Sequence, residues 1–386
     1  MKKMPDHRFL AAAILFCLAA TASADGFQNV AQNASGLGVS YAGAAAVADD
    51  ASTIFYNPAG LSRLDGMQVS FGGVGLLQDY EFDDHRSIGL SGPEGGRAGE
   101  WQVLPNAYFS WKLNEDWSLG VGVSSPHSLD MEYDRDWIGR GIVVKSRLSS
   151  VNLNPAIAWR LSDRIALGFG LDYQKIRLKS ALDAARESDS DSAWGWNAGA
   201  LFTLSPSMRV GVAYRSGMEY RFDAPTRNEI SALTAFPGVD ERGRFETPGV
   251  FSLSVWQQVS EQWEAMGDFS YTRWKSLDGY NRDSWRLAWG AAYTYNERWK
   301  SKFGLAYERS PLSRSGRTAF LPDAHRMWFS LGGQYRFGKS SALDFGYAYQ
   351  WVMKKPHLDS PVGSARLRGD YDASGHLLGI QYSQGF

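Results

Sequence analysis

The chain has 386 residues, of which 40 are basic and 41 acidic, so its formal net charge is −1. This balance gives no reason to expect nucleic acid as a partner, and it indicates no acidic tail. Aromatic residues make up 14% of the chain and there are 41 glycines, a mixture that suits many β-strands with interfacial aromatic side chains. An α/β enzyme fits this composition poorly.

The first 24 residues have the three parts of a secretory signal peptide: a positive start (Lys2, Lys3 and Arg8), an apolar stretch (9–20) and the A-x-A cleavage site (22–24). Cleavage near Ala24 would leave a mature chain that begins at Asp25. The single cysteine, Cys17, would be removed, which leaves neither a disulfide nor a thiol nucleophile. Beyond residue 24 no apolar run reaches 18 residues, which excludes helical membrane spans. The chain is therefore expected to be periplasmic, secreted or in the outer membrane.

Residues 25–65 lack the strand pattern of the later chain. The segment is rich in Ala, Gly and Ser, and it carries scattered apolar side chains at Phe27, Leu37, Val47, Ile54 and Phe55. Two placements are open: an extension on the periplasmic side, or a plug folded into the interior of the domain that the later residues form. A disordered arm would be more charged and less apolar than this segment.

From about residue 66, large apolar residues alternate with small or polar ones. In residues 117–124, for example, Trp117, Leu119, Val121 and Val123 alternate with Ser and Gly. In a soluble sandwich the apolar face would form the core, whereas in an outer-membrane barrel it would face lipid. The connections distinguish the two, because short polar turns alternate strictly with long polar connections. This regularity is typical of a barrel whose two rims face the periplasm and the cell exterior.

Fourteen strands are predicted, an even number, as in single-chain bacterial barrels. They fall near 66–79, 101–112, 117–126, 147–160, 165–179, 193–203, 209–215, 245–258, 263–272, 285–294, 299–307, 325–337, 342–351 and 376–386. Most are long enough to supply the roughly 9–11 residues that a tilted strand needs to cross the hydrocarbon core. Aromatic residues lie beside the short turns, where an interfacial girdle is expected: Trp117, Trp159, Trp263 and Trp299. We therefore predict an all-β fold, a 14-stranded antiparallel transmembrane β-barrel over residues 66–386 that ends on the aromatic Phe386.

A barrel of this size is wider than an eight-stranded one, whose side chains fill its interior, so an unfilled interior would leak. The small and apolar residues 25–65 suit packing inside a polar-walled tube. We therefore predict that they form a plug, or hatch, inside the barrel.

The mature chain shows no catalytic motif: G-x-S-x-G and H-E-x-x-H are both absent, and no cysteines remain to bind a metal. His127 lies close in sequence to Ser124, Ser125 and Asp130, which leaves a Ser-His-Asp grouping open. Such residues are common by chance in a polar loop, so we expect them to be solvated. The same holds for the acidic runs at 83–84, 130–136 and 183–191, which lack the spacing of a calcium loop. No catalytic residue, metal or cofactor is predicted.

Four segments occur in order along the chain: ASGLGVSYAGAAAVADDASTIFYNPAGL, SPHSLDMEYDRDWIGRGIVVKSRLSSVNLNPAIAW, DFSYTRWKSLDGY and LPDAHRMWFSLGGQYRFG. Together they resemble the FadL family of outer-membrane transporters of long-chain fatty acids and other hydrophobic compounds, including the TodX type. The resemblance covers nearly the whole mature chain. It implies a fourteen-stranded barrel with an N-terminal hatch and passive, ligand-gated uptake. It also implies a route: the ligand lands on the extracellular loops, moves to a pocket against the hatch, and leaves sideways through a kink in the third strand.

The resemblance also implies roles for single residues. Arg177 and Arg282 fall where basic residues of the family meet the fatty acid carboxylate. The hatch motif is Asn57, Pro58 and Ala59. The candidates for the pocket lining are apolar residues of the hatch and the nearby wall: Phe27, Val47, Ile54, Phe55 and Trp285. A lateral opening is predicted in the third strand, which carries residues tolerated at bulges or strand ends: Gly120, Gly122 and Pro126.

The leading hypothesis is uptake of long-chain fatty acids or related hydrophobic compounds. The alternatives are a channel for aromatic hydrocarbons, an outer-membrane enzyme that acts on lipids, and an adhesion or structural barrel. The expected partners are the hydrophobic ligand, outer-membrane lipid with lipopolysaccharide, and the barrel assembly machinery during biogenesis. No nucleic acid is expected, and the protein should act as a monomer in the outer membrane of a Gram-negative bacterium.

Overall fold

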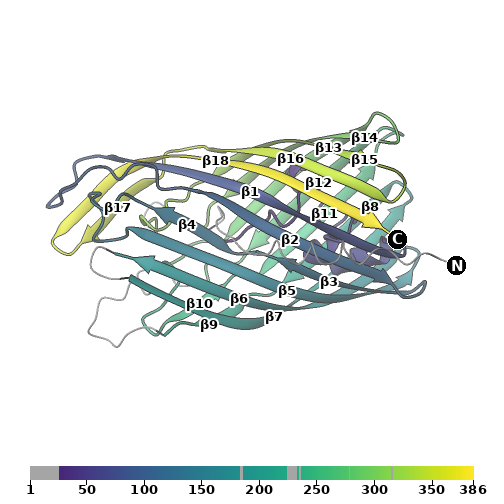
Figure 1. Ribbon diagram of the computed structural model, residues 1–386, viewed down its shortest axis with the longest axis horizontal. Coiled ribbons are helices and arrows are strands. Elements are labelled where there is room, and N and C mark those ends of the chain that lie inside the picture. The colour runs from purple at the N-terminus through teal and green to yellow at the C-terminus, as the bar shows by residue number, and fades with distance from the viewer. Residues whose placement is uncertain (1–25, 183–185, 224–232, 234–235, 278, 314–315) are drawn as a thin grey trace.

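The computed structural model describes residues 26–182, 186–223, 233, 236–277, 279–313 and 316–386. The expected signal peptide, residues 1–24, lies outside these ranges. The described chain forms one long barrel of tilted strands, and its C-terminus lies at one end of the barrel (Figure 1). The short turns lie at that end, which we term periplasmic, and the long connections lie at the other, which we term extracellular.

Within the described ranges, fourteen strands form a closed antiparallel ring in which each strand pairs with the next. They are β1 (Met67–Asp84), β2 (Trp101–Lys112), β3 (Trp117–Ser124), β5 (Lys145–Ser162), β6 (Ile165–Ala181), β7 (Arg186–Ser205), β8 (Met208–Arg215), β11 (Val250–Gln258), β12 (Trp263–Thr272), β13 (Ser284–Thr294), β14 (Trp299–Arg309), β15 (Arg326–Arg336), β16 (Ser341–Val352) and β18 (Ala365–Gly385). The first and last strands close the ring, from Gln68 opposite Gly385 to Asp84 opposite Gly369. The predicted 14-stranded antiparallel barrel is confirmed.

Four further strands of the described chain lie outside the ring, in the connections at the extracellular end. β4 (Ser128–Glu132) pairs with β5, and β17 (His357–Val362) pairs with β18. β9 (Met218–Arg221) and β10 (Arg244–Thr247) form a separate hairpin. These additions give the extracellular loops a structure of their own.

Side chains alternate between the two faces of the wall. On β3, Trp117, Leu119 and Val121 face outward and are 36–39% exposed, whereas Ser118 faces inward and is buried. Exposed apolar side chains of this kind occur on most strands of the ring and form the surface that a bilayer covers. Near the periplasmic end, Trp117 stacks on Trp159 with ring centroids 5.6 Å apart, where an interfacial aromatic girdle belongs.

Several strands extend farther toward the extracellular end than the sequence predicted. β1 runs to Asp84, β18 begins at Ala365 rather than near 376, and the β6–β7 hairpin occupies much of the connection expected at 180–192. Backbone pairing continues above the membrane, whereas the apolar alternation stops there because the outer face then meets water. Hydrophobic periodicity therefore locates the membrane-spanning part of a strand rather than its full length.

Residues 26–66 form no strand of the ring and lie inside it (Figure 1). They include η1 (Leu37–Val39), α2 (Thr53–Tyr56) and η2 (Pro58–Arg63). η1 contacts β13 to β16, while η2 contacts β2, β3, β5, β6 and β7, so the segment touches different sides of the wall. No helix in the described part of the chain is both long and apolar enough to cross a membrane.

Two inward-facing glycines show why one face of the wall is small. A Cβ atom on Gly168 would lie 2.1 Å from the Ala59 nitrogen, and one on Gly199 would lie 2.1 Å from Asn57 Oδ1. These distances are far inside van der Waals contact, so a glycine is required where the N-terminal segment approaches the wall. The small face of the alternation is thus explained, at these positions, by the segment that packs against it.

Candidate binding site

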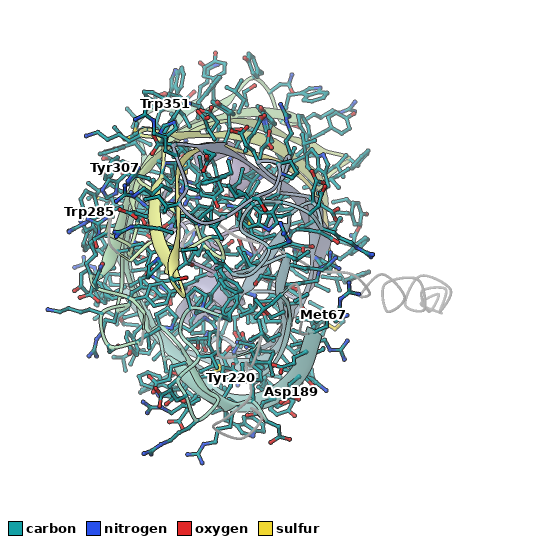
Figure 2. All side chains as sticks on the ribbon, turned by 90° about the vertical axis from the view of Figure 1, so that its left-hand side faces the viewer. Met67, Asp189, Tyr220, Trp285, Tyr307 and Trp351 are labelled. Atoms are coloured by element: carbon teal, nitrogen blue, oxygen red, sulfur yellow. The ribbon has the colours of Figure 1, made fainter. Side chains whose placement is uncertain are left out.

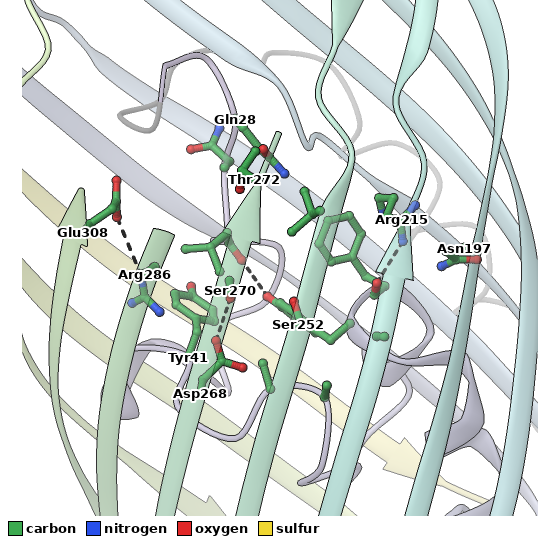
Figure 3. A pocket seen from close by; sticks show the side chains of 18 of the residues that line it. Gln28, Tyr41, Asn197, Arg215, Ser252, Asp268, Ser270, Thr272, Arg286 and Glu308 are labelled. Carbon is green, nitrogen blue, oxygen red and sulfur yellow. Dashed lines mark hydrogen bonds and ion pairs between the residues drawn. The ribbon is translucent and has the colours of Figure 1, made fainter. Parts of the chain in front are cut away.

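A cavity lies inside the barrel between the N-terminal segment and the wall (Figure 3). Its volume, taken as the space open to the centres of water-sized molecules, is about 100 Å³. Apolar side chains from the segment and from several strands line it, among them Phe55, Leu76, Val250, Trp328 and Leu377. Two arginines, Arg215 and Arg286, lie at its edge. An apolar cavity with a few convergent polar groups is the usual form of a small-molecule site.

Arg286 projects inward from β13 and is 5% exposed. Its Nη2 donates to the Ser40 carbonyl oxygen at 2.6 Å, and its Nε lies 3.7 Å from Glu308 Oε2. Its guanidinium carbon lies 5.0 Å from the centre of the Trp328 ring. Its Nη1 is buried and has no hydrogen-bond partner among the described residues. Because buried polar groups are nearly always paired, a free guanidinium nitrogen in a cavity wall is suited to an anionic ligand group.

Arg215 lies across the cavity, on β8 (Figure 3). It forms an ion pair with Asp172 of β6, and its Nη2 donates to the Phe55 carbonyl oxygen at 2.8 Å. Its guanidinium carbon lies 4.3 Å from the centre of the Phe55 ring, a cation–π contact that holds the ring in the cavity wall. Arg215 is thus engaged by neighbours within the protein, which leaves Arg286 as the cation better placed for a ligand.

A smaller cavity lies between the segment and β12 to β15, and its lining includes Val47, Asp50 and Lys302. Tyr41 and Tyr56 line both cavities, so the segment lies between them. Burial raises the pKa of the Asp50 carboxyl, because removal from water disfavours the charged form. The lining of the smaller cavity also includes Asp49, Glu264 and Lys300, so it holds more acidic and basic side chains than that of the larger one.

An aromatic cluster occupies the loops at the extracellular end. Within it, the Phe27 ring lies 4.9 Å from Trp274 and 5.0 Å from Phe245, measured between ring centroids. Tyr133 stacks on Trp137 at 4.0 Å. Phe27, which the sequence suggested as a pocket-lining residue, belongs to this cluster and does not line either cavity.

The third strand of the ring ends early. β3 stops at Ser124, and the chain leaves the wall for three residues before β4 begins at Ser128. Over this break the backbone pairs with the N-terminal segment: Asn29 donates to the Pro126 carbonyl oxygen at 2.7 Å, and Ser128 donates to the Phe27 carbonyl oxygen at 2.8 Å. At the break the segment thus takes the place of a neighbouring strand.

Polar side chains gather around the same break. The Gln32 side chain accepts from the Ser125 nitrogen at 2.8 Å and donates to the Ser125 carbonyl oxygen at 3.0 Å. Gln102, Asn106 and Asn152, which face inward from β2 and β5, are buried, and their amide groups have no hydrogen-bond partner among the described residues. Such groups are rare in proteins, so this part of the wall is not closed by its own side chains.

His127 lies in the break and is buried, which corrects the expectation of a solvated loop residue. Its Nδ1 lies 3.2 Å from Gln174 Oε1, and Gln174 donates to the Tyr220 hydroxyl at 2.7 Å. Burial lowers the pKa of His127 to about 3, so the ring is neutral at pH 7. Asp130 forms an ion pair with Arg147. Among the described residues, the polar partner of the His127 ring is the side-chain amide of Gln174. A Ser-His-Asp triad requires a carboxylate at that place.

The predicted hatch residues have different positions. Phe55 lines the larger cavity and Val47 the smaller one. Ile54 is fully buried against β3 and lines neither cavity, and a Cβ atom on Gly120 would lie 2.7 Å from its Cδ1. Gly122 is close to Tyr108 instead. The two glycines thus leave room for side chains inside the barrel just below the break.

Trp285 faces outward from β13 and not into the cavity (Figure 2). Its ring lies 5.1 Å from that of Tyr307 on the neighbouring strand, measured between centroids. Adjacent residues of a strand point to opposite faces, so the inward position of Arg286 places Trp285 outside. The prediction that Trp285 lines the pocket is therefore wrong for this cavity, which its neighbour Arg286 lines instead.

The structure does not bring Arg177 or Arg282 to the cavity. Arg177 is exposed on the outer face of β6, and Arg282 donates to the carbonyl oxygens of Ser310 and Leu312 in the loops. Arg215 and Arg286, which line the cavity, were missed. A signal for them was present in the alternation of each strand. Each arginine occupies an inward-facing position, and most residues at such positions are small or uncharged.

The motif Asn57-Pro58-Ala59 joins parts of the segment to the wall. Asn57 Oδ1 accepts from the Ala59 nitrogen at 3.0 Å, and its Nδ2 donates to the carbonyl oxygens of Ala45 at 2.8 Å and of Ala200 at 3.1 Å. Pro58 occupies the first position of η2, where its fixed φ is favourable and its missing N–H is not needed. One asparagine therefore caps η2 and ties the segment to β7.

Comparison with known proteins places the chain in a family. Residues 15–386 match the family model described as "Outer membrane protein transport protein (OMPP1/FadL/TodX)". The chain is 30% identical to "Outer membrane protein P1" of Haemophilus influenzae, with 90% of each chain covered. It is 26% identical to the "Long-chain fatty acid transport protein" of Escherichia coli strain K12, over 89% of this chain and 93% of that protein.

Solved structures agree in fold. A Pseudomonas aeruginosa FadL homologue superposes with a TM-score of 0.82 at 21% identity, covering 94% of this chain and 100% of that one. The toluene transporter TodX of Pseudomonas putida has a TM-score of 0.68 at 17% identity with the same coverage. At these identities the two structures support the fold alone, whereas the family match spans nearly the whole sequence. The chain therefore belongs to the OMPP1/FadL/TodX family of outer membrane transport proteins.

Proposed function

We propose that this protein is a passive channel for long-chain fatty acids or related hydrophobic carboxylates. The observation that carries the proposal is the buried, unpaired Nη1 of Arg286 in the wall of an apolar cavity. A ligand carboxylate would pair with this nitrogen, while its acyl chain would lie against Phe55, Leu76 and Leu377. The relative named as a long-chain fatty acid transport protein supports the same substrate class.

Uptake of such a ligand needs no energy source. Each buried CH₂ group contributes about 0.8 kcal/mol, so a long acyl chain gains on the order of 10 kcal/mol before entropic losses. The polar sugar layer of the outer leaflet blocks the direct route of an apolar molecule. A conduit with apolar walls removes that barrier, and the ligand then moves down its own gradient.

Residues 25–65 are proposed to act as the hatch of this channel. The described part of the segment is bonded to the wall on several sides, by Arg209 to the Ala46 carbonyl oxygen at 3.1 Å and by Arg286 to that of Ser40 at 2.6 Å. A carboxylate bound at Nη1 of Arg286 would draw the guanidinium toward the ligand and so weaken the bond that Nη2 donates to Ser40. Binding would therefore favour a loosened segment, which is a physical basis for gating by the ligand.

The break between β3 and β4 is proposed as the lateral exit toward the membrane. Three observations support it: the strand stops at Ser124, unpaired amides surround the gap, and the N-terminal segment covers it. Just below the gap, Gly120 and Gly122 make room for the side chains of Ile54 and Tyr108, so there the wall is packed against neighbouring side chains that would have to move when a ligand passes. Pro126 lies within the gap, where it cannot donate a hydrogen bond to a neighbouring strand.

A second candidate is uptake of aromatic hydrocarbons. It is favoured by the aromatic share of the cavity lining, which comprises Tyr41, Phe55, Tyr56, Tyr214 and Trp328. An uncharged aromatic ligand would make no ion pair with Arg286. Substitution of this residue should therefore affect the binding of a fatty acid and leave that of an aromatic hydrocarbon unchanged.

Removal of the protein from its host is expected to lower uptake of labelled oleate to the level of simple diffusion. A complementing copy should restore the initial rate, and uptake of a small water-soluble solute should not change. The measurement is the initial rate of oleate accumulation in the two strains. Normal oleate uptake without the protein would contradict the transport proposal and favour the adhesion or structural alternative.

A disulfide between residues 29 and 128 is expected to block uptake reversibly. Asn29 Nδ2 donates to Ser128 Oγ at 2.7 Å, so the two side chains meet where the segment covers the break. The single native cysteine, Cys17, lies in the expected signal peptide, so the pair Asn29→Cys/Ser128→Cys would form one defined bridge. Oleate uptake should fall to the background level under oxidising conditions and recover with a reductant.

The matched control joins two strands of the wall. Ser70 Oγ and Ser383 Oγ lie 2.9 Å apart across the β1–β18 seam, so Ser70→Cys/Ser383→Cys should bridge without any effect on uptake. If the oxidised Asn29→Cys/Ser128→Cys variant takes up oleate at the wild-type rate, the segment need not move away from the break.

A further inference from the structure

The extracellular part of the β6–β7 hairpin carries a column of cations on its outer face. Lys175, Arg177 and Lys179 alternate along β6 and all are exposed, and Arg186 is exposed at the start of β7. Same-face residues of a strand lie about 6.8 Å apart, so the three cations of β6 span about 14 Å. We refer to these four residues as the basic column.

The basic column is not neutralised within the described residues, where none of its four members forms an ion pair. The cations on the neighbouring β5 differ in this respect: Lys145 pairs with Glu132, and Arg147 pairs with Asp130. The carboxylates of β7 lie on its other face. Asp191, for example, accepts from the Arg221 nitrogen at 2.8 Å.

The opposite side of the barrel shows that this is a local feature. The extracellular extensions of β1 and β18 are also highly charged, but their charges are balanced. Lys355 pairs with Asp372 at 2.7 Å, and Arg97 pairs with Asp79 at 3.0 Å. A general tendency of the rim toward charge therefore does not explain the unpaired cations of β6 and β7.

The basic column begins directly above the apolar belt. Tyr173 and Trp194 lie opposite each other on β6 and β7, with ring centroids 4.9 Å apart and 39% and 68% of their surfaces exposed. Leu171 and Trp196 continue the exposed apolar face below them. Exposed aromatic pairs of this kind mark the membrane–water interface. Lys175 is the next outward residue above Tyr173, so the column starts at the level of lipid headgroups.

Serine hydroxyls flank the column on both sides. The register places Ser149 of β5 and Ser190 of β7 beside Arg177, and Ser192 beside Lys175. Hydroxyl, ammonium and guanidinium groups together form a surface rich in hydrogen-bond donors and positive charge. Guanidinium and ammonium groups bind phosphate oxygens strongly, the guanidinium in a bidentate manner.

We propose that the basic column binds the phosphate groups of lipopolysaccharide in the outer leaflet. The lipid is the occupant that its position selects, because the column faces outward and stands on the apolar belt, where acyl chains lie. The phosphates of this lipid are attached just above its acyl chains, at the height of Lys175 and Arg177. Arg177 thus has a role at the lipid boundary of the protein, outside the cavity.

The test compares lipopolysaccharide binding by the purified, delipidated barrel in detergent. In the variant Lys175→Ala/Arg177→Ala/Lys179→Ala the affinity should fall about 100-fold, on the scale known for three cations at an anionic lipid surface. The control Lys355→Ala removes an exposed cation from a balanced pair and should bind as the wild type does. Heat-modifiable gel mobility confirms that each variant is folded. If the triple variant does not fold, Arg177→Ala alone should lower the affinity about fivefold.

A second arm identifies the lipid group. Dephosphorylated lipopolysaccharide should bind the wild type as weakly as intact lipopolysaccharide binds the triple variant. Equal binding of intact lipid by the wild type and by the folded variant would overturn the proposal. Equal binding of intact and dephosphorylated lipid by the wild type would overturn it as well. Fatty acid uptake is not part of this readout, so the result is independent of the proposed transport function.

Discussion

Replacement of Gly168 by valine is expected to displace the N-terminal segment and make the barrel leak. The new Cβ atom would lie 2.1 Å from the Ala59 nitrogen and 2.4 Å from the Pro58 carbonyl carbon, and backbone atoms cannot rotate away. Overpacking of this kind costs about 1–3 kcal/mol, which shifts the equilibrium toward a displaced segment roughly fivefold to 150-fold. The measurement is the ion conductance of the purified protein in planar bilayers, where the wild type should be nearly silent.

The matched control is Gly267→Val. Gly267 faces outward from β12, where an added Cβ atom would meet nothing within 4 Å. This variant should insert and remain closed. If Gly168→Val inserts with normal heat-modifiable mobility and the bilayer stays silent, the segment does not close the barrel and the hatch assignment fails. The pair therefore separates closure of the lumen from assembly of the wall.

Replacement of Arg286 by glutamine is expected to weaken fatty acid binding while binding of toluene is retained. A hydrogen bond to a charged group contributes about 1.5–3 kcal/mol, so the affinity for oleate should fall roughly tenfold to hundredfold. Arg286→Lys keeps the charge but loses the planar guanidinium, so its affinity for oleate should lie between that of the wild type and that of Arg286→Gln. Glu308 would not be left without a cation in the Arg286→Gln variant, because Arg326 Nε lies 3.6 Å from its Oε1. The measurement is equilibrium binding of labelled oleate and labelled toluene in detergent.

The control for this experiment is Arg177→Ala, which removes an arginine that the family resemblance had suggested. Because Arg177 lies on the outer face of β6, we expect its loss to leave oleate binding unchanged. The reverse outcome, weaker oleate binding in Arg177→Ala and normal binding in Arg286→Gln, would move the carboxylate site out of the cavity. A loss of both oleate and toluene binding in Arg286→Gln would point to damage of the segment through Ser40, and would remove the support for a carboxylate role.

Much of the barrel could be predicted because its physics is local. A strand in a bilayer must place an apolar side chain toward lipid at every second residue, so Trp117, Leu119 and Val121 mark β3 without any knowledge of its neighbours. The same rule failed above the membrane, where β18 begins eleven residues earlier than the alternation indicated. Water accepts polar side chains on either face, so the sequence there carries no periodic signal.

The cavity could not be predicted in the same way. Its arginines and aromatic residues come from β8, β13, β15 and the N-terminal segment, and nothing in the local sequence states which of them meet. The alternation of inward and outward side chains along β13 would have favoured Arg286 over Trp285 as the residue that faces the cavity. It would not have shown that Arg215 is engaged by Asp172 and Phe55 while one nitrogen of Arg286 is free.

By itself, the sequence determined the number of membrane-spanning strands and the side chains that face lipid, because the bilayer imposes its constraint on each strand separately. It also indicated, through family resemblance, the class of transport protein. Only the tertiary structure decided which inward side chains meet, that His127 is buried in the break after β3, and that the cations of β6 and β7 face outward and unpaired. Those features depend on closure of the ring, which brings together residues far apart in the chain whose neighbours no local pattern encodes.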